Sequence, residues 1–352
     1  GCGETPYARL VTQLFGDRMF IANATGCSSI WGGSAPSTPY TINREGRGPA
    51  WSNSLFEDNA EFGLGMAVSM NTRRKEMKSA VKRLAEKSEF CDVATEWLDG
   101  MEDSRKAESA ARKLIEVCKD SDDADAKFVA KNADLLPKPS IWIFGGDGWA
   151  YDIGYGGLDH VLANNLNVNV LVLDTEVYSN TGGQSSKSSQ AASIAKFAAG
   201  GKTTAKKDLG QIAMAYGHVY VAAISMGANK NQTLKALKEA ESYDGPSLIL
   251  AYSPCAEHGI KGGLANHQRT QAKAVECGYF DLYRYDPRKE TPLTIDSKEP
   301  DYEKMLDFMM TETRYSQLPK VKGETAYEMF EKTKKDAMKR HKRLLAIAKE
   351  EM

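Results

Sequence analysis

The chain has 352 residues, a formal net charge of −1 and 41% hydrophobic residues, which is typical of a globular protein with one large or two modest domains. The near-neutral charge argues against a nucleic-acid-binding protein, and no apolar run approaches the ~20 residues that a membrane helix needs. The six cysteines include no Cys-x-x-Cys pair, so neither a zinc ribbon nor a disulfide framework is indicated, and we expect reduced thiols.

The N-terminal segment predicts one strand and a packed loop. Residues Arg18–Ala24 form a short apolar run that is typical of a strand, and the run leads to a loop that carries Cys27. The following stretch, Gly26–Asn53, is rich in glycine, serine, proline and asparagine, but it also contains tryptophan and tyrosine residues. We therefore expect an ordered loop that packs over a functional site.

Residues from about 72 to 135 predict surface helices. The stretch is highly charged, and apolar residues recur at helical spacing in two stripes, Met77–Ala85 and Ala107–Cys118. We expect these helices to be inserted between the first strand and the main sheet. Cys118, on the apolar stripe, is expected to be a buried core thiol.

From residue 140 onward, short apolar runs alternate with helical patterns. Strands are expected at Ser140–Phe144, Asn167–Asp174, His218–Ser225 and Ser247–Tyr252. Helices are expected at Gly157–Asn165, Ser189–Phe197, Asp208–Tyr216, Asn231–Ser242 and Leu264–Cys277. This alternation predicts an α/β fold with a doubly wound, mostly parallel sheet.

The tail, Gly323–Glu350, predicts a charged helix. Its basic residues are Lys332, Lys334, Lys335, Lys339, Arg340, Lys342 and Arg343. A solvated helix face explains these charges most simply. The alternative is a docking surface for an acidic electron carrier.

Two of the predicted strands each end in a possible oxygen ligand. Asp147 lies in a Gly-Gly-Asp-Gly turn directly after Ser140–Phe144, and Thr175 directly follows Asn167–Asp174. The carboxyl ends of neighbouring parallel strands open into one crevice, so we expect these side chains to lie close together. Glycines let a bulky anion approach the backbone, and Mg²⁺ takes carboxylate and hydroxyl oxygens together with phosphate oxygens. The pattern therefore predicts a diphosphate that is tethered through Mg²⁺.

Longer strings around these turns resemble one family. Residues 142–160, which begin Trp-Ile-Phe-Gly-Gly-Asp-Gly-Trp-Ala-Tyr, and residues 174–184, Asp-Thr-Glu-Val-Tyr-Ser-Asn-Thr-Gly-Gly-Gln, are similar to the thiamine diphosphate-binding domain of pyruvate:ferredoxin (flavodoxin) oxidoreductases. Shorter stretches at 2–7, 24–33 and 53–58 resemble the same family. The resemblance implies a thiamine diphosphate- and Mg²⁺-binding α/β domain over residues 1–286, with the helical insertion at about 72–135. Residues 287–352 are then expected to form a C-terminal helical extension.

The resemblance also implies which residues hold the cofactor. Mg²⁺ is expected on Asp147, Thr175 and the backbone carbonyl of Val177, and Asn180 is expected to be a catalytic residue that donates a hydrogen bond to the substrate. The cofactor-binding residues are expected to be Glu4, Cys27, Gly146, Asp147, Gly148, Trp149, Thr175, Glu176, Val177, Tyr178, Ser179 and Asn180.

Three cysteines match cluster-ligand positions of the family. Cys2, Cys27 and Cys255 are expected to hold a [4Fe–4S] cluster with a fourth cysteine that would precede Gly1. We therefore expect the chain to be the C-terminal piece of a longer polypeptide. The other cysteines match no cluster position and are expected to be structural: Cys91, Cys118 and Cys277.

The expected electron route brings the two sites together. Cys27 follows a predicted strand, as Asp147 does, and parallel strands would place both at one edge of the sheet. We therefore expect Cys27, with its neighbours Gly26 and Ser28, to line the same cavity as Asp147 and Asn180.

The resemblance implies oxidative decarboxylation of pyruvate to acetyl-CoA and CO₂, with electrons passed through the [4Fe–4S] cluster to ferredoxin or flavodoxin. The expected partners are pyruvate, coenzyme A, the electron carrier, the remaining domains of the same polypeptide and a second copy in a homodimer, but no nucleic acid and no membrane. The isolated chain lacks the domain that activates the aminopyrimidine, so we do not expect it to turn over alone. The expected location is the cytoplasm, or the hydrogenosome if the source is an anaerobic eukaryote.

Two alternatives stay open, and the sequence argues against a third. The chain resembles, less closely, β subunits of oxidoreductases that act on 2-oxoglutarate or branched 2-oxoacids. A non-enzymatic electron-transfer iron–sulfur module is also possible, although it would leave the Mg²⁺-type turns without a role. A dinucleotide-binding module requires a Gly-x-Gly-x-x-Gly turn after a strand and an acidic residue ~20 positions later, which this chain does not have.

Overall fold

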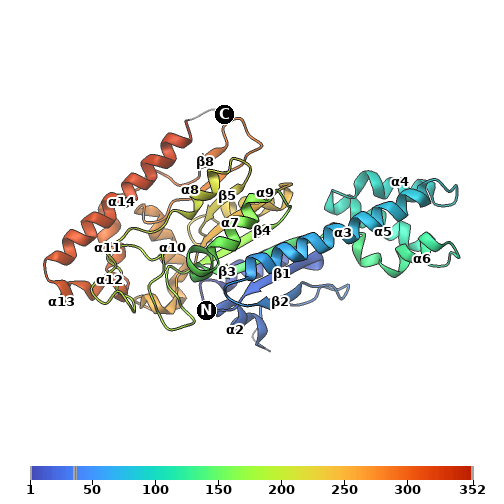
Figure 1. Cartoon of the computed structure of the whole chain (residues 1–352). Coiled ribbons are helices and arrows are strands. Elements are labelled where there is room, and N and C mark those ends of the chain that lie inside the picture. The colour runs from blue at the N-terminus through green and yellow to red at the C-terminus, as the bar shows by residue number, and fades with distance from the viewer. Residues whose placement is uncertain (1, 35, 37, 350–352) are drawn as a thin grey trace.

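The computed structural model describes residues 2–34, 36 and 38–349 (Figure 1). Within these residues, an eight-stranded sheet has the order β2-β1-β3-β4-β6-β5-β7-β8. Strands β1 to β6 pair in parallel, whereas β7 pairs antiparallel with β5 and β8 pairs antiparallel with β7. The mostly parallel α/β fold expected from the sequence is therefore confirmed.

The strands that the apolar runs predict are all present. The strands are β1 Met19–Ala24, β2 Ala50–Ser54, β3 Ser140–Gly146, β4 Asn169–Asp174, β5 Tyr220–Ile224, β6 Ser247–Tyr252, β7 Tyr283–Tyr285 and β8 Leu293–Ile295. Every residue of β4, β5 and β6 is buried, because helices cover both faces of this part of the sheet. The sequence did not reveal β2, which is polar and half-exposed, or the three-residue strands β7 and β8.

Helices form the outer layers. The helices are α1 Thr5–Phe15, α2 Cys27–Gly33, α3 Asn59–Ala85, α4 Cys91–Gly100, α5 Ser104–Cys118, α6 Ala124–Lys131, α7 Tyr155–Ala163, α8 Leu209–Met214, α9 Lys230–Ser242, α10 His267–Glu276, α11 Met305–Met309, α12 Thr313–Ser316, α13 Leu318–Lys322 and α14 Thr325–Ile347. None of those in the described part of the chain is long and apolar enough to cross a membrane.

The two faces of the sheet build two separate cores, because side chains alternate along each strand. On β3, Trp142 and Phe144 belong to the core that α1 and α9 cover, whereas Ile141 and Ile143 belong to the core that α3, α7, α8 and α14 cover. This alternation fixes the register of β3, and with it the position of the residues that follow the strand.

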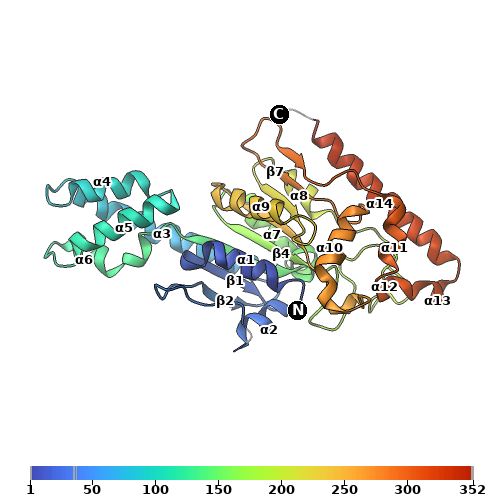
Figure 2. The ribbon, with the colours of Figure 1, turned by 180° about the vertical axis from the view of Figure 1, so that it is seen from behind.

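Helix α3 extends from the body of the molecule, and α4, α5 and α6 pack against its far end (Figures 1 and 2). The stripe that contains Met77 is buried on α3, and the stripe that contains Leu114 is buried on α5. At the base of this projection, the guanidinium of Arg74 donates hydrogen bonds to the carbonyls of Leu135, Pro137 and Met101. This buried cation therefore ties α3 to the end of α4 and to the segment that leads back to β3.

Three expectations need correction. Residues Ser189–Phe197 form a loop rather than a helix, since Ala192 and Phe197 have positive φ angles of 67° and 66° and Ser189 donates a hydrogen bond to another loop. The stretch Gly26–Asn53 is not entirely a loop, because it contains α2 and the start of β2. The sheet also continues to β8, which lies beyond residue 286.

Candidate functional site

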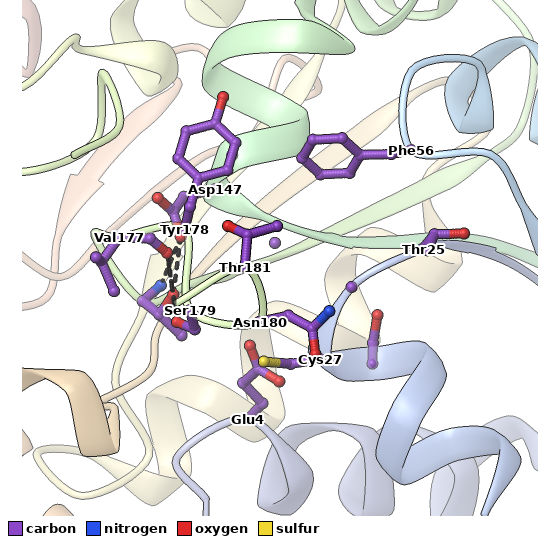
Figure 3. A pocket seen from close by; sticks show the side chains of 15 residues that line it. Glu4, Thr25, Cys27, Phe56, Asp147, Val177, Tyr178, Ser179, Asn180 and Thr181 are labelled. Carbon is purple, nitrogen blue, oxygen red and sulfur yellow. Dashed lines mark hydrogen bonds between the residues drawn. The ribbon is translucent and has the colours of Figure 1, made fainter. Parts of the chain in front are cut away.

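A cavity of about 180 Å³ opens at the carboxyl ends of β1, β3 and β4, which are neighbours in the sheet (Figure 3). Residues from the segments that follow these strands line it, together with the start of α1 and the turn before α3. The lining residues are Glu4, Thr25, Gly26, Cys27, Ser28, Phe56, Gly146, Asp147, Gly148, Thr175, Val177, Tyr178, Ser179, Asn180 and Thr181. The structure therefore places Cys27, with Gly26 and Ser28, in the same cavity as Asp147 and Asn180.

Three oxygens meet at the hydroxyl group of Thr175. Thr175 Oγ1 lies 2.9 Å from Asp147 Oδ1, 3.0 Å from the Val177 carbonyl oxygen and 2.9 Å from Ser179 Oγ. A carboxylate, a hydroxyl and a carbonyl are the oxygen donors that Mg²⁺ accepts beside phosphate. Among the described residues, no group of three or more His, Cys, Asp or Glu side chains is arranged to hold a metal ion. The site therefore fits Mg²⁺ only if the Thr175 hydroxyl, the Val177 carbonyl and oxygens from outside the chain complete the coordination that Asp147 begins.

The side chain of Asp147 is a buried carboxylate, so its negative charge is unfavourable without a nearby cation. Its Oδ1 accepts hydrogen bonds from the Thr175 backbone and side chain, and its Oδ2 accepts one from Ser186 Oγ at 2.5 Å. Burial, and then the negative charge of nearby Asp174, raise the pKa of Asp147 to about 7. The structure gives Asp147 no ion-pair partner among the residues that it describes. A bound divalent cation would supply the missing charge and lower this pKa.

The glycines around Asp147 have different roles. A Cβ atom at Gly148 would lie 2.6 Å from the Tyr178 ring, and one at Gly145 would overlap the ring of Trp149. Gly146 lines the cavity and has space beside it, because a Cβ there would come no closer than 3.9 Å to its nearest non-adjacent neighbour, the Leu173 carbonyl oxygen. The backbone of Gly146 is thus open to a bulky anion, whereas Gly148 lets the Tyr178 ring pack closely against the turn.

Trp149 does not line the cavity. Its side chain is fully buried in the core beneath the turn, and the Gly154 amide donates a hydrogen bond of 2.8 Å to its carbonyl, five residues back. Such wide helical turns often occur at functional sites. The indole of Trp149 therefore packs against the turn that contains Gly145. Only the backbone of Trp149 remains as a candidate for cofactor contact.

Glu4 reaches the cavity from the start of α1. Its carboxylate accepts a hydrogen bond of 2.7 Å from Trp31 Nε1, and burial raises its pKa to about 7. Trp31 belongs to the aromatic loop region that was expected to pack over a site, and its contact with Glu4 agrees with that expectation. The backbone amide of Glu4 also donates to Cys2 Sγ at 3.3 Å.

Each of the three candidate cluster cysteines lies at the cavity or contacts a residue that lines it, but within the described part of the chain the three do not form a group that is arranged to hold a metal ion. Cys27 lines the cavity, Cys2 contacts Glu4, and Cys255 Sγ lies 3.2 Å from Ser179 Oγ. Burial raises the pKa of all three thiols, to about 12 for Cys2, and the charge of Cys255 raises the pKa of Cys2 and Cys27 further. The other cysteines lie elsewhere, exposed at Cys91 and buried in the core at Cys118 and Cys277.

Glu176 points away from the cavity, although we expected it to bind the cofactor. Its carboxylate is fully buried and contacts Lys206, Arg314 and Tyr279 on the other side of the 175–180 loop. Burial alone would raise its pKa, but the charges of Lys206 and Arg314 and the Tyr279 hydroxyl lower it to about 2. Glu176 is therefore a charged residue within the protein rather than a cavity residue.

The remaining expected residues line the cavity, and the structure adds others. Asn180 and Cys27 both line the cavity and are labelled in Figure 3, and Tyr178 packs edge-on against Phe56 at 5.9 Å between ring centroids. Sequence reasoning did not single out Phe56 or the Asp147 partner Ser186. The only available signals were the family-like stretch at 53–58 and the serine-rich run at 185–189.

Comparisons with known proteins show what the chain is similar to. Residues 126–251 match the family described as thiamine pyrophosphate enzyme, C-terminal TPP binding domain. The chain is 55% identical to the pyruvate:ferredoxin oxidoreductase of Moorella thermoacetica, over 97% of this chain and 30% of that protein. It is 53% identical to the pyruvate-flavodoxin oxidoreductase of Klebsiella pneumoniae, over 100% of this chain and 31% of that protein.

A solved structure of 2-oxoglutarate:ferredoxin oxidoreductase from Magnetococcus marinus aligns with a TM-score of 0.46 and 15% identity, over 88% of this chain and 84% of that one. This similarity is too low to support a statement about the chain. The chain spans about 30% of the length of the two curated relatives described above. The chain is therefore similar over nearly its whole length to one part of the pyruvate:ferredoxin (flavodoxin) oxidoreductases, and it contains a match to the thiamine pyrophosphate-binding domain.

Proposed function

We propose that the chain supplies one half of the active site of a thiamine diphosphate-dependent pyruvate:ferredoxin (flavodoxin) oxidoreductase. The whole enzyme would convert pyruvate and coenzyme A to acetyl-CoA and CO₂ and pass the electrons through a [4Fe–4S] cluster to ferredoxin or flavodoxin. The observation that carries this proposal is the convergence of Cys27, Asp147 and Thr175 at the carboxyl ends of three adjacent parallel strands.

The residues of the chain have distinct tasks in this proposal. Asp147 Oδ1, Thr175 Oγ1 and the Val177 carbonyl would hold Mg²⁺, and the backbone at Gly146 and Gly148 would approach the diphosphate closely. Thiamine diphosphate, when bound, supplies an electron sink for the decarboxylation of a 2-oxoacid.

The opposite wall of the cavity would face the reacting groups. The amide of Asn180 would donate a hydrogen bond to the substrate, and Glu4 would contact the cofactor. Cys2, Cys27 and Cys255 would ligate the cluster as thiolates. Because their pKa values as free thiols are raised, cluster binding must release protons from them.

The rest of the assembly lies outside this chain. We propose that other domains of the same polypeptide activate the aminopyrimidine, that the enzyme is a cytoplasmic homodimer, and that the isolated chain is inactive. Within the chain, we propose a cofactor-binding domain over residues 1–286 and an extension over 287–352.

The proposal can be tested on the full-length protein by titration with thiamine diphosphate, with and without Mg²⁺. We expect binding that requires Mg²⁺, and a lower kcat for Asn180→Ala with little change in that binding. Cys255→Ser should lose iron, whereas the core variant Cys277→Ser should retain it. Iron retention without any binding of thiamine diphosphate would favour the electron-transfer module instead.

A further inference from the structure

The loop that carries the proposed Mg²⁺ ligands turns at Glu176. This residue has a φ of 59°, a left-handed conformation that a side chain with a Cβ atom adopts only at a cost. The turn reverses the chain between Thr175 and Val177, so that the Thr175 hydroxyl comes within 3.0 Å of the Val177 carbonyl oxygen. The spacing of two proposed ligands therefore depends on an unfavourable backbone conformation at the residue between them.

The side chain of Glu176 is held from the far side of the loop. Its Oε1 lies 3.1 Å from Lys206 Nζ, and its Oε2 lies 2.9 Å from Arg314 Nη2 and accepts a hydrogen bond of 2.5 Å from the Tyr279 hydroxyl. Both carboxylate oxygens are thus bound by buried groups. These contacts fix the direction of the side chain, and through it the backbone conformation of the turn.

Arg314 connects this turn to a distant part of the chain. It lies on α12, and its Nε also pairs with Glu312 Oε2 at 2.7 Å. The backbone of α12 is anchored as well, because the Thr313 amide and hydroxyl both donate to the Gly259 carbonyl, at 3.0 and 2.8 Å. The Ile194 amide donates to the Arg314 carbonyl at 2.8 Å. Arg314 is therefore held firmly enough to act as a fixed point for the loop.

The buried carboxylates around Glu176 depend on a small number of buried cations to balance their charge. The carboxylates of Asp174, Glu176 and Glu312 are all fully buried, and the Lys and Arg side chains that pair with them in the described part of the chain are Lys206 and Arg314, with side-chain exposures of 12% and 4%. Among the described residues, loss of Arg314 would leave Glu312 without a Lys or Arg partner, and it would leave Glu176 with Lys206, which also pairs with Asp174. A buried carboxylate that loses its cationic partner moves toward water. That movement would release the turn.

We infer that Arg314 is a positioning residue for the metal site: by holding Glu176, it keeps the Thr175 hydroxyl and the Val177 carbonyl at the spacing that a divalent cation requires. This inference rests on the proposed function of the cavity as an Mg²⁺–diphosphate site. It assigns a role at the cofactor to a residue from the C-terminal part of the chain, which does not line the cavity itself.

The test is the Mg²⁺ concentration that gives half-maximal binding of thiamine diphosphate to metal-free full-length enzyme, measured by calorimetry. Arg314→Met should raise this concentration by about 10- to 100-fold, the usual effect of losing a partner of a metal ligand. Arg314→Lys should restore part of the loss. The matched control is Arg284→Met, since Arg284 is equally buried, at 5% exposure, and pairs with Glu239 and Asp296 away from the loop.

The outcomes separate the two hypotheses. An unchanged Mg²⁺ requirement in Arg314→Met, or an equal rise in Arg284→Met, would overturn the positioning role. If Arg314→Met does not fold, Glu176→Gln decides in its place: it keeps the size of the side chain, should also raise the requirement, and overturns the inference if it does not. If the wild-type enzyme binds thiamine diphosphate without Mg²⁺, or not at all, the proposed function itself fails.

Discussion

The buried carboxylate of Asp147 should oppose folding when no cation is bound. Its pKa rises from 3.8 to about 7 in the folded chain, because burial and the charge of Asp174 disfavour the ionised form. At ~1.36 kcal/mol per pKa unit, this shift corresponds to about 4 kcal/mol. A raised carboxyl pKa means that the folded state binds more protons than the unfolded state between these two pH values. The carboxyl group of Asp147 therefore does not reduce the free energy of unfolding below pH 3.8, and its destabilising effect grows as the pH rises to about 7.

Replacing this carboxyl by the isosteric amide, Asp147→Asn, removes the charge. The amide oxygen can still accept from Thr175, whereas the amide nitrogen donates to Ser186 Oγ, which must then accept instead of donating. The cofactor-free variant should be more stable than wild type at pH 8, by up to about 4 kcal/mol, and the difference should disappear near pH 4. The same variant should lose Mg²⁺-dependent binding of thiamine diphosphate. A gain in stability would thus accompany a loss of function.

Urea unfolding of the cofactor-free protein, followed by tryptophan fluorescence from pH 4 to pH 8, measures this difference. Asp281→Asn provides a control of opposite sign, because Asp281 is also buried but pairs with Arg340 and His341, which lower its pKa. That variant should be less stable than wild type at pH 8. The reasoning is refuted if Asp147→Asn is no more stable than wild type at pH 8, or if both proteins show the same dependence on pH.

Two further predictions concern the surroundings of the site. Gly145→Ala should destabilise the chain by about 1–3 kcal/mol, because the new methyl group overlaps the rigid ring of Trp149. Gly146→Ala should leave the melting temperature nearly unchanged, because there is open space beside Gly146. Equal melting temperatures of the two variants would contradict this prediction. The pKa of His341 is raised because its ring donates a hydrogen bond to Asp281, so its contribution to the free energy of unfolding is complete below pH 6.5 and is lost as the pH rises through the folded-state pKa. His341→Gln should therefore lower the free energy of unfolding more at pH 6 than at pH 9. An equal loss at both pH values in urea unfolding would argue against this prediction.

The sequence alone predicted the centre of the sheet and the turns that carry the site. The runs that became β3 and β4 are apolar along their whole length, because both faces of a parallel sheet are buried, so their pattern needed no tertiary information. Asp147 and Thr175 follow directly from the ends of these strands. The same logic placed Cys27 in their cavity, since β1 is parallel to β3 and adjacent to it.

Tertiary contacts decided the parts where local pattern was misleading or silent. Residues 189–197 have the small and apolar residues of a helix, yet their backbone groups and serines bond to the 175–180 loop and to the segment that contains Lys202, so they form a loop instead. The edge strand β2 is short and polar, with only one partner strand to define it.

The sequence could not predict the direction of the Glu176 side chain either. A glutamate in a cofactor-binding loop favours a cofactor contact when only neighbours in the chain are considered. Its actual partners, Lys206 and Arg314, lie 30 and 138 residues away, and only the folded chain brings their charges to it. Sequence determined which groups follow each strand, because that is a local property, whereas the packing of distant cations determined which of those groups faces the cavity.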